Sequence, residues 1–169
     1  MVTTDLHYSA ILYSYKMREQ RDGLKVKIIK HNDWRFDNII LDPNHPTQII
    51  GVLDWEMATL GDPLMDLGSA LAYWVEESDS ALFKATRRQP TNLKGMFTRK
   101  EVVDYYLEKT GLDVENWTFY EVFGIFRLAV IAQQIYYRYH HKQTNNPAFK
   151  DFWILIHALH IRALKLIGL

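Results

Sequence analysis

No cysteine occurs among the 169 residues, which excludes disulfide bonds and thiolate metal sites and is compatible with a reducing cytosol. An excess of either charge is missing too, because 20 lysine and arginine residues balance 20 aspartate and glutamate residues. A chain without a net positive field does not attract nucleic acid or an anionic membrane surface over long range. We therefore expect neither of these as a partner.

Long apolar stretches are missing as well. The longest predominantly apolar ones, around residues 122–132 and 152–159, contain glycine, arginine or histidine and fall well below the roughly 20 residues that cross a bilayer. The first twelve residues lack the basic start and the apolar run of a secretory signal. These absences predict a soluble protein of the cytoplasm.

The chain does contain enough apolar residues for a sizeable core. Hydrophobic residues make up 48% of it, and its length is usual for one domain. We expect a single domain over residues 1–169. Within it, residues 1–75 form a β-containing core, and residues 96–169 form a helical subdomain. The expected fold class is α+β and predominantly helical.

Two β-type runs occur in the first part, at residues 39–41 and 49–53. The segment between them, Asp42-Pro43-Asn44-His45-Pro46, consists of turn-forming residues. This pattern predicts a short β-hairpin.

Helix signals follow the hairpin. Asp62 before Pro63 predicts an N-cap and the first position of a helix that continues to Trp74. Residues 76–95 are polar and are predicted to form a loop or lid.

Three further helices are predicted in the second part. Residues 98–101 fit a capping box before a helix that Gly111 ends, and residues 118–121 repeat that spacing before a long helix to about residue 141. Asn146-Pro147 predicts the start of a last helix, which reaches about residue 167.

The polar segments on either side of the hairpin suit phosphoryl transfer. Such a reaction needs a carboxylate that orients an acceptor hydroxyl and takes its proton, and Mg²⁺ that neutralises charge on the ATP oxygens. Asp33 suits the first task, and Asn38 with Asp54 suits the second. Asp33 and Asn38 have the five-residue offset of the catalytic Asp and the metal-binding Asn in protein kinases. The hairpin should return the chain so that Asp54 meets Asn38.

Three linked motifs carry a resemblance to a known family. They are His-x-Asp-x₄-Asn from His31, Leu-Asp-Trp-Glu from Leu53, and Gly-Asp-Pro-x-x-Asp-Leu from Gly61. In this order they resemble the aminoglycoside phosphotransferase and choline kinase-like superfamily, whose fold is that of the protein kinases. The second half of the chain, especially the aromatic residues 116–129, is similar to the branch associated with acyl-CoA dehydrogenases. That similarity points toward a hydroxyacyl-type acceptor.

The resemblance implies a role for each motif residue. It makes Asp33 the catalytic base, with His31 bracing its loop, and makes Asn38 and Asp54 the ligands of Mg²⁺ and hence of ATP. Asp62 and Asp66 would hold the segment after the metal site. Glu56 either supports the metal site or pairs with a nearby base, and Asp66 either braces the loop or faces solvent.

Two departures from the family pattern accompany the match. Asn32 stands where the family usually has glycine, although asparagine tolerates unusual backbone angles. Only about 30 residues precede His31, too few for the nucleotide-binding β-lobe of roughly 100 residues that the family places there. The expectation is therefore a C-terminal catalytic lobe, with the N-terminal β-lobe absent.

These observations leave two main hypotheses for function. In the first, the protein is an ATP- and Mg²⁺-dependent phosphotransferase acting on the hydroxyl of a small molecule. In the second, it is a non-catalytic truncated lobe or pseudokinase that binds a partner or forms a homodimer through the exposed lobe interface. A metal-dependent hydrolase with ions between Asp33 and Asp54 is a weaker third hypothesis.

Overall fold

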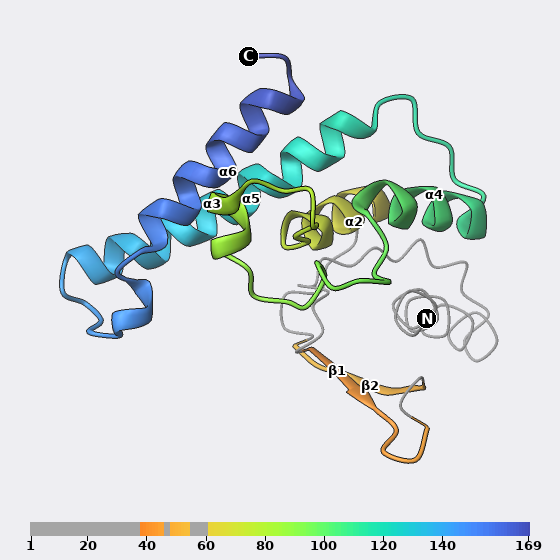
Figure 1. Cartoon of the computed structure of the whole chain (residues 1–169), viewed down its shortest axis with the longest axis horizontal. Coiled ribbons are helices and arrows are strands. Elements are labelled where there is room, and N and C mark those ends of the chain that lie inside the picture. The colour runs from red at the N-terminus through yellow and green to blue at the C-terminus, as the bar shows by residue number, and fades with distance from the viewer. Residues whose placement is uncertain (1–37, 46–47, 55–60) are drawn as a thin grey trace.

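The computed structural model describes residues 38–45, 48–54 and 61–169. In chain order its elements are a β-hairpin, α2, α3, α4, α5, a 3₁₀ turn and α6. The helices form the bulk of the structure, and the hairpin projects from them (Figure 1). The predominantly helical α+β fold predicted from the sequence is thus confirmed.

The hairpin is an antiparallel pair of β1, Ile39–Leu41, and β2, Ile49–Val52. Ile39 pairs with Val52 and Ile40 with Gly51, and an irregularity between Ile40 and Leu41 then brings Leu41 opposite Ile49. The turn is stabilised by the Asp42 carboxylate, which accepts hydrogen bonds from the backbone N–H groups of Asn44 and His45. The predicted hairpin is therefore confirmed.

Helix α2, Pro63–Ala72, begins as predicted at the N-cap Asp62. Helix α4, Arg99–Thr110, has both hydrogen bonds of a capping box between Thr98 and Glu101. It ends at Gly111, whose φ of 66° is in the left-handed region where glycine carries no steric cost. Local capping chemistry therefore predicted these boundaries correctly.

Two other boundaries differ from the prediction. A short helix, α3 at Ala81–Ala85, lies within the predicted loop; its N-cap Ser80 accepts a hydrogen bond from the buried Phe83. A 3₁₀ turn, Pro147–Phe149, follows Asn146, and α6, Phe152–Leu166, begins only beyond it. Asn146 caps that turn rather than the helix.

The capping box predicted at residues 118–121 is also wrong. Helix α5, Trp117–His140, begins two residues earlier than a cap at Thr118 would place it, and its N-cap Asn116 makes no side-chain cap hydrogen bond. The Glu121 side chain does not turn back to the helix start, because its Oε1 accepts a 2.7 Å hydrogen bond from Arg162 of α6. A tertiary ion pair has replaced the local cap.

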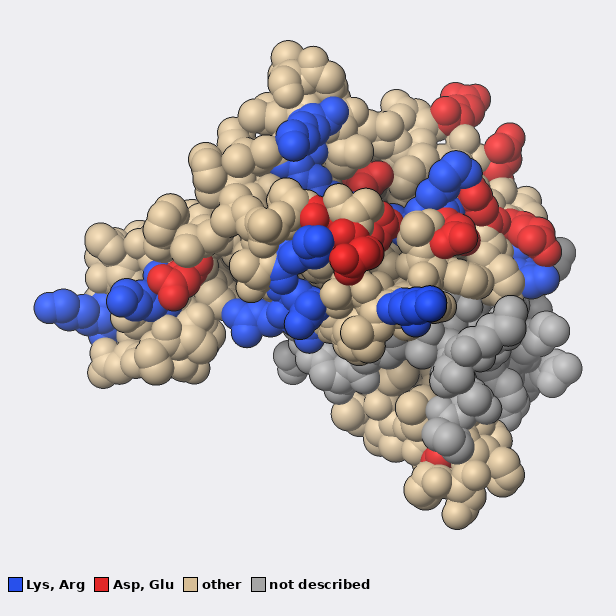
Figure 2. Space-filling model, viewed as in Figure 1, with Lys and Arg blue, Asp and Glu red and all other residues tan. Residues whose placement is uncertain are grey.

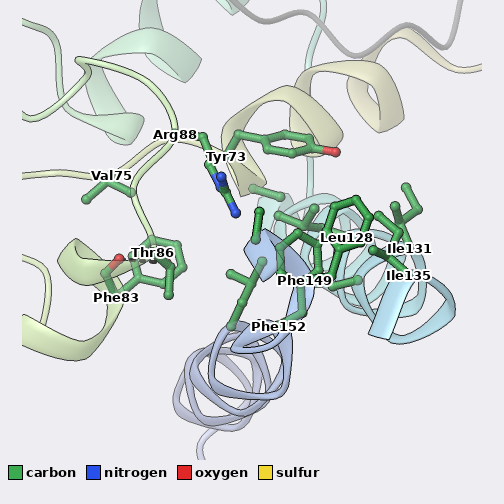
Figure 3. Close-up of a pocket in the computed structure, with 14 residues that line it drawn as sticks. Tyr73, Val75, Phe83, Thr86, Arg88, Leu128, Ile131, Ile135, Phe149 and Phe152 are labelled. Carbon is green, nitrogen blue, oxygen red and sulfur yellow. Dashed lines mark hydrogen bonds between the residues drawn. The ribbon is translucent and has the colours of Figure 1, made fainter. Parts of the chain in front are cut away.

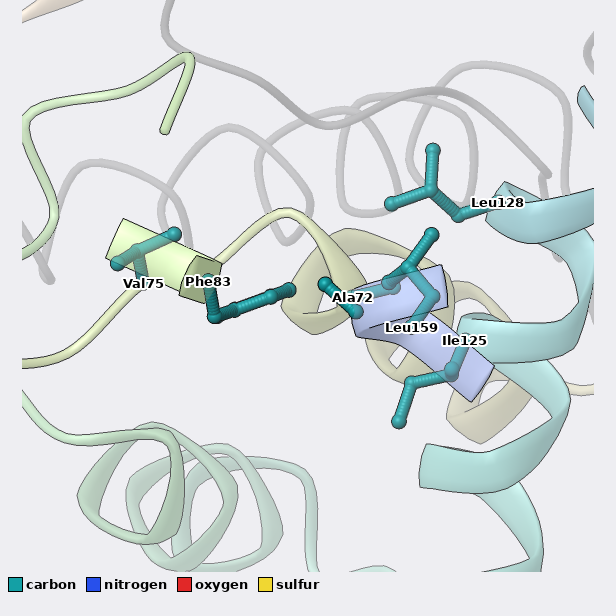
Figure 4. Close-up of a cluster of buried hydrophobic side chains, with 7 residues drawn as sticks. Ala72, Val75, Phe83, Ile125, Leu128 and Leu159 are labelled. Carbon is teal, nitrogen blue, oxygen red and sulfur yellow. The ribbon is translucent and has the colours of Figure 1, made fainter. Parts of the chain in front are cut away.

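The core lies where α5 packs against α2 on one side and α6 on the other. Its buried members come from α2, α3, α5, α6 and the chain between α2 and α3, and Figure 4 shows six of them labelled. They are Ala72, Val75, Phe83, Ile125, Leu128, Ala158 and Leu159. Within the described residues, no helix is both long and apolar enough to span a membrane.

The crossing of α2 and α5 depends on two glycines. A Cβ on Gly68 would lie 2.2 Å from the carbonyl oxygen of Tyr120, and a Cβ on Gly124 would lie 2.1 Å from the carbonyl oxygen of Gly68. Both obstacles are backbone atoms, so the helices can approach this closely only without side chains at the two positions. The crossing sets where α2, and hence Asp62 at its start, lies against α5.

A largely buried ion-pair network joins α4, α5, α6 and the turn after α2. The Arg99 guanidinium donates hydrogen bonds of 2.8 Å to both carboxylate oxygens of Asp79 and lies 3.2 Å from Glu76. It also lies 4.0 Å from Glu121, which pairs with Arg162. On the face that Figure 2 shows, charges of both signs are interspersed.

Burial alone would raise the pKa of Asp79. The hydrogen bonds from Arg99 and the Glu76 backbone N–H, together with the Arg99 charge, hold that pKa below its ordinary 3.8.

Replacing Arg99 with leucine should lower the free energy of unfolding by about 2 kcal/mol at pH 7. This loss lies between those measured for surface ion pairs and for buried ion pairs. Urea unfolding measures this loss. The exposed pair Lys100–Asp104 supplies the control, Lys100→Leu, which should change stability by less than about 0.5 kcal/mol.

The cost of Arg99→Leu should depend on pH in one direction. A lowered pKa means that the ion pair stabilises the fold above the unfolded-state pKa and that this contribution is lost as pH falls through the folded-state pKa. The stability difference between wild type and variant should therefore shrink below about pH 4. A difference that stays constant from pH 7 to pH 3 would show that Arg99 acts through packing and its hydrogen bond to the Trp74 carbonyl, and not through the carboxylates.

Candidate functional site

The open end of the hairpin brings two predicted metal ligands together. Asn38 immediately precedes β1, and its carbonyl oxygen accepts a 2.8 Å hydrogen bond from the Leu53 backbone N–H. This bond extends the strand pairing by one step, so that Asp54 follows directly beside Asn38. The register of the hairpin therefore determines the proximity of the two side chains.

The two side chains meet at 3.5 Å, measured from Nδ2 of Asn38 to Oδ2 of Asp54. Asn38 is buried, whereas Asp54 is exposed, so the pair has one anchored member and one open to solvent. Neighbouring ligands of an octahedral ion with bonds of 2.0–2.1 Å lie about 3 Å apart. One amide oxygen and one carboxylate are hard oxygen donors, and their separation fits a shared Mg²⁺ once the Asn38 amide turns its oxygen inward.

Asp54 has an unusual backbone conformation. Its φ is 61°, in the left-handed region that few residues other than glycine adopt, although aspartate and asparagine are enriched there. Such conformations occur preferentially at functional sites, where the surroundings hold them in place. Sequence analysis did not predict this conformation, although aspartate tolerates it better than most residues.

Asp62 uses both carboxylate oxygens within the fold. Oδ1 accepts a 2.9 Å hydrogen bond from the Leu64 backbone N–H, and Oδ2 accepts a 2.9 Å hydrogen bond from the Tyr120 hydroxyl. The first bond caps α2, and the second ties that cap to α5. Sequence reasoning missed Tyr120 because 58 residues separate it from Asp62. Together they fix the chain at the N-cap of α2, eight positions after Asp54.

The hydrogen bond to Asp62 raises the pKa of the Tyr120 hydroxyl above its ordinary 10. The bond therefore stabilises the fold fully below pH 10, and this contribution is lost as pH rises through the raised pKa.

Tyr120→Phe should lower the free energy of unfolding by about 1 kcal/mol at pH 7, and urea titration measures this loss. Tyr137→Phe, at an exposed tyrosine of the same helix, should have almost no effect. Equal stability of the two variants would mean that the Asp62 bond contributes nothing.

Of the other predicted site residues, the structure describes only Asp66. Asp66 is buried within the first turn of α2, which does not fit the alternative in which it faces solvent. An acidic residue there also interacts favourably with the positive end of the helix dipole. Asp33, His31 and Glu56 lie outside the described residues, so their predicted roles stay predictions.

Comparison with known proteins places this site in a family. Residues 17–101, half of the chain, match the phosphotransferase enzyme family known as APH. The chain therefore belongs to that family, and the matched range includes Asn38, Asp54, Asp62 and Asp66. The resemblance inferred from the three motifs is confirmed.

The chain is also similar to proteins named as acyl-CoA dehydrogenase family members. The chain is 39% identical over 123 residues to acyl-CoA dehydrogenase family member 10 of Mus musculus, a match over 72% of this chain and 11% of that protein. It is 32% identical over 131 residues to acyl-CoA dehydrogenase family member 11 of Rattus norvegicus, which covers 76% of this chain and 16% of that protein. The chain thus spans less than a fifth of the length of these relatives.

The fold has a counterpart among solved structures. The crystal structure of a Ralstonia eutropha JMP134 protein designated an aminoglycoside phosphotransferase superposes with a TM-score of 0.57 at 21% identity. The match covers 94% of this chain and 52% of that one. At this identity the likeness supports the fold, a part of the aminoglycoside phosphotransferase architecture, and leaves the substrate open.

Proposed function

We propose that this chain contributes the catalytic and metal-binding side of a phosphotransferase that moves the γ-phosphoryl group of ATP to a hydroxyl of a small molecule. The observation that supports this proposal most strongly is the proximity of Asn38 and Asp54 at the open end of the hairpin, in a chain of the phosphotransferase family. Magnesium bound there would neutralise charge on the phosphate oxygens of ATP. Water and phosphate oxygens would complete its coordination, as is usual for this ion.

The proposed roles follow the order of the reaction. Asp33 orients the acceptor hydroxyl and takes its proton while the hydroxyl oxygen forms a bond to the γ-phosphorus. The bond from that phosphorus to the bridging oxygen breaks, and ADP leaves. Asn38 and Asp54 hold the metal, His31 braces the Asp33 loop, and Glu56 supports the metal site. Asp62 keeps the start of α2 fixed through its cap and its bond to Tyr120.

For the acceptor, we propose a hydroxyacyl thioester. Its support is the group of relatives named as acyl-CoA dehydrogenase family members, which match over about three quarters of this chain. The fold itself does not choose an acceptor, because one scaffold serves many substrates.

The test is ATP consumption with a panel of hydroxylated metabolites, hydroxyacyl thioesters included, in the presence and absence of Mg²⁺. We expect turnover that requires both the metal and one class of acceptor, and its loss in Asp33→Asn. Wild-type turnover by Asp33→Asn would remove that residue from the role of base. Turnover unaffected by chelation of Mg²⁺ would contradict the metal site.

One observation favours the second candidate, a non-catalytic lobe that binds a partner or self-associates. Apolar side chains of the hairpin are exposed: Ile40 by 44%, Ile50 by 55% and Leu53 by 47%. Such a surface is typical of an interface. Calorimetry with Mg-ATP separates the candidates, because micromolar binding by these 169 residues supports the kinase, whereas dimerisation without nucleotide binding supports the second candidate.

A further inference from the structure

A cavity of about 470 Å³ opens among α2, α3, α5, the 3₁₀ turn and α6. Part of its wall belongs to the main core: Val75, Phe83 and Leu128 are buried members of that cluster. Protein interiors are otherwise close-packed, with few voids larger than a water molecule. A hollow of this volume is within the usual range for small-molecule sites, which often lie between helices.

The chemistry of the lining is strongly apolar. Of its 14 residues, 11 are alanine, valine, leucine, isoleucine or phenylalanine. The polar members are Tyr73, Thr86 and Arg88, and the Thr86 hydroxyl already donates a 2.7 Å hydrogen bond to the Phe83 carbonyl. The cavity therefore favours an apolar body, aromatic or aliphatic.

Arg88 adds one positive charge at the cavity. Its guanidinium carbon lies 5.4 Å from the centre of the Phe152 ring, and Figure 3 shows the side chain directed in among the lining residues. Across the part of the chain that the structure describes, Arg88 forms no ion pair with a carboxylate, and the aromatic contact leaves its fork of N–H donors available. A carboxylate accepts two parallel hydrogen bonds from such a guanidinium, in a bidentate pair.

From this combination we infer a binding site for a small monocarboxylate with an aromatic or aliphatic apolar body. The apolar body lies against Leu128, Ile131 and Phe149, and the carboxylate pairs with Arg88. Among the residues that the structure describes, Asn38 and Asp54 of the proposed phosphoryl-transfer centre supply none of the lining. The site is therefore an inference that stands whether or not the proposed kinase activity does.

The probe for this site is 4-phenylbutyrate, with the uncharged 4-phenyl-1-butanol as its matched partner. Titrated into the full chain and followed by NMR chemical shifts, the acid should bind with a dissociation constant below about 1 mM. It should bind about tenfold more tightly than the alcohol, because only the acid pairs with Arg88. Equal affinities for acid and alcohol would overturn the role of Arg88.

Two exposed positions supply variants that leave the core intact. Arg88→Gln should abolish the difference between acid and alcohol, whereas Arg87→Gln should preserve it, because Arg87 is exposed beside Asn92 and does not line the cavity. Ala148→Trp, at an exposed lining position, should weaken both probes by blocking the cavity. Acid binding that survives both Arg88→Gln and Ala148→Trp would locate the ligand elsewhere and overturn the proposal.

One wild-type measurement is independent of these variants. Intermolecular nuclear Overhauser effects should connect the phenyl protons of bound 4-phenylbutyrate with the methyl groups of Leu128 and Ile131. Contacts to other methyl groups only, or no binding at millimolar concentration, would contradict the site.

Discussion

Asp54→Asn is expected to lower the rate of the proposed ATP-dependent phosphoryl transfer by about 10³-fold or more, because the proposed Mg²⁺ site would lose its charged ligand. Asparagine has the shape of aspartate and tolerates the left-handed backbone that residue 54 adopts at φ 61°. The substitution therefore removes the negative charge while leaving the hairpin intact. The measurement is ADP release at saturating Mg-ATP with the acceptor identified by the screen.

The same hairpin offers a matched control. Asp42 accepts backbone hydrogen bonds in the turn, at the opposite end of the strands from Asp54. Asparagine accepts the same bonds through its amide oxygen, so Asp42→Asn should keep wild-type turnover. If Asp54→Asn also retains turnover within about twofold, residue 54 does not provide the charge on which catalysis depends.

Gly124→Ala is expected to cost at least about 3 kcal/mol of unfolding free energy, at the upper end of what overpacking usually costs. The added Cβ would lie 2.1 Å from the Gly68 carbonyl oxygen, and only a shift of α2 against α5 relieves that clash. Helix propensity predicts the opposite sign, because alanine is favoured over glycine inside a helix by up to about 1 kcal/mol. Urea unfolding followed by circular dichroism therefore distinguishes the two effects by direction.

Gly61→Ala serves as the control for this prediction. Among the described residues, no atom lies within 4 Å of a Cβ at Gly61, and its φ is outside the positive region. This variant should change stability by no more than about 0.5 kcal/mol. A Gly124→Ala protein as stable as wild type would show that the helix crossing does not require the glycine pair.

Local chemistry made part of this structure predictable. The hairpin followed from two β-type runs around a turn, and its return of the chain predicted that Asp54 would meet Asn38, which the 3.5 Å separation confirms. The caps at Asp62 and Thr98 followed from side chains that bond to backbone within three residues. Such features depend on neighbours in the sequence.

The features that the sequence did not predict depend on distant partners. Glu121 fits a local capping box but instead pairs with Arg162, 41 residues away. Helix α3 is only five residues long, too short for a periodic signal, and its Ser80 cap was its one local sign. Tyr120 and the Gly68–Gly124 crossing likewise involve partners that only tertiary packing brings together.

The most direct test of the phosphoryl-transfer centre is a crystal structure with Mn²⁺ and a non-hydrolysable ATP analogue, in which anomalous scattering locates the metal. We expect an anomalous peak within about 2.5 Å of side-chain oxygens of both Asn38 and Asp54, with phosphate oxygens completing the coordination. A peak that contacts neither residue, in crystals that contain the nucleotide, would refute the proposed metal site.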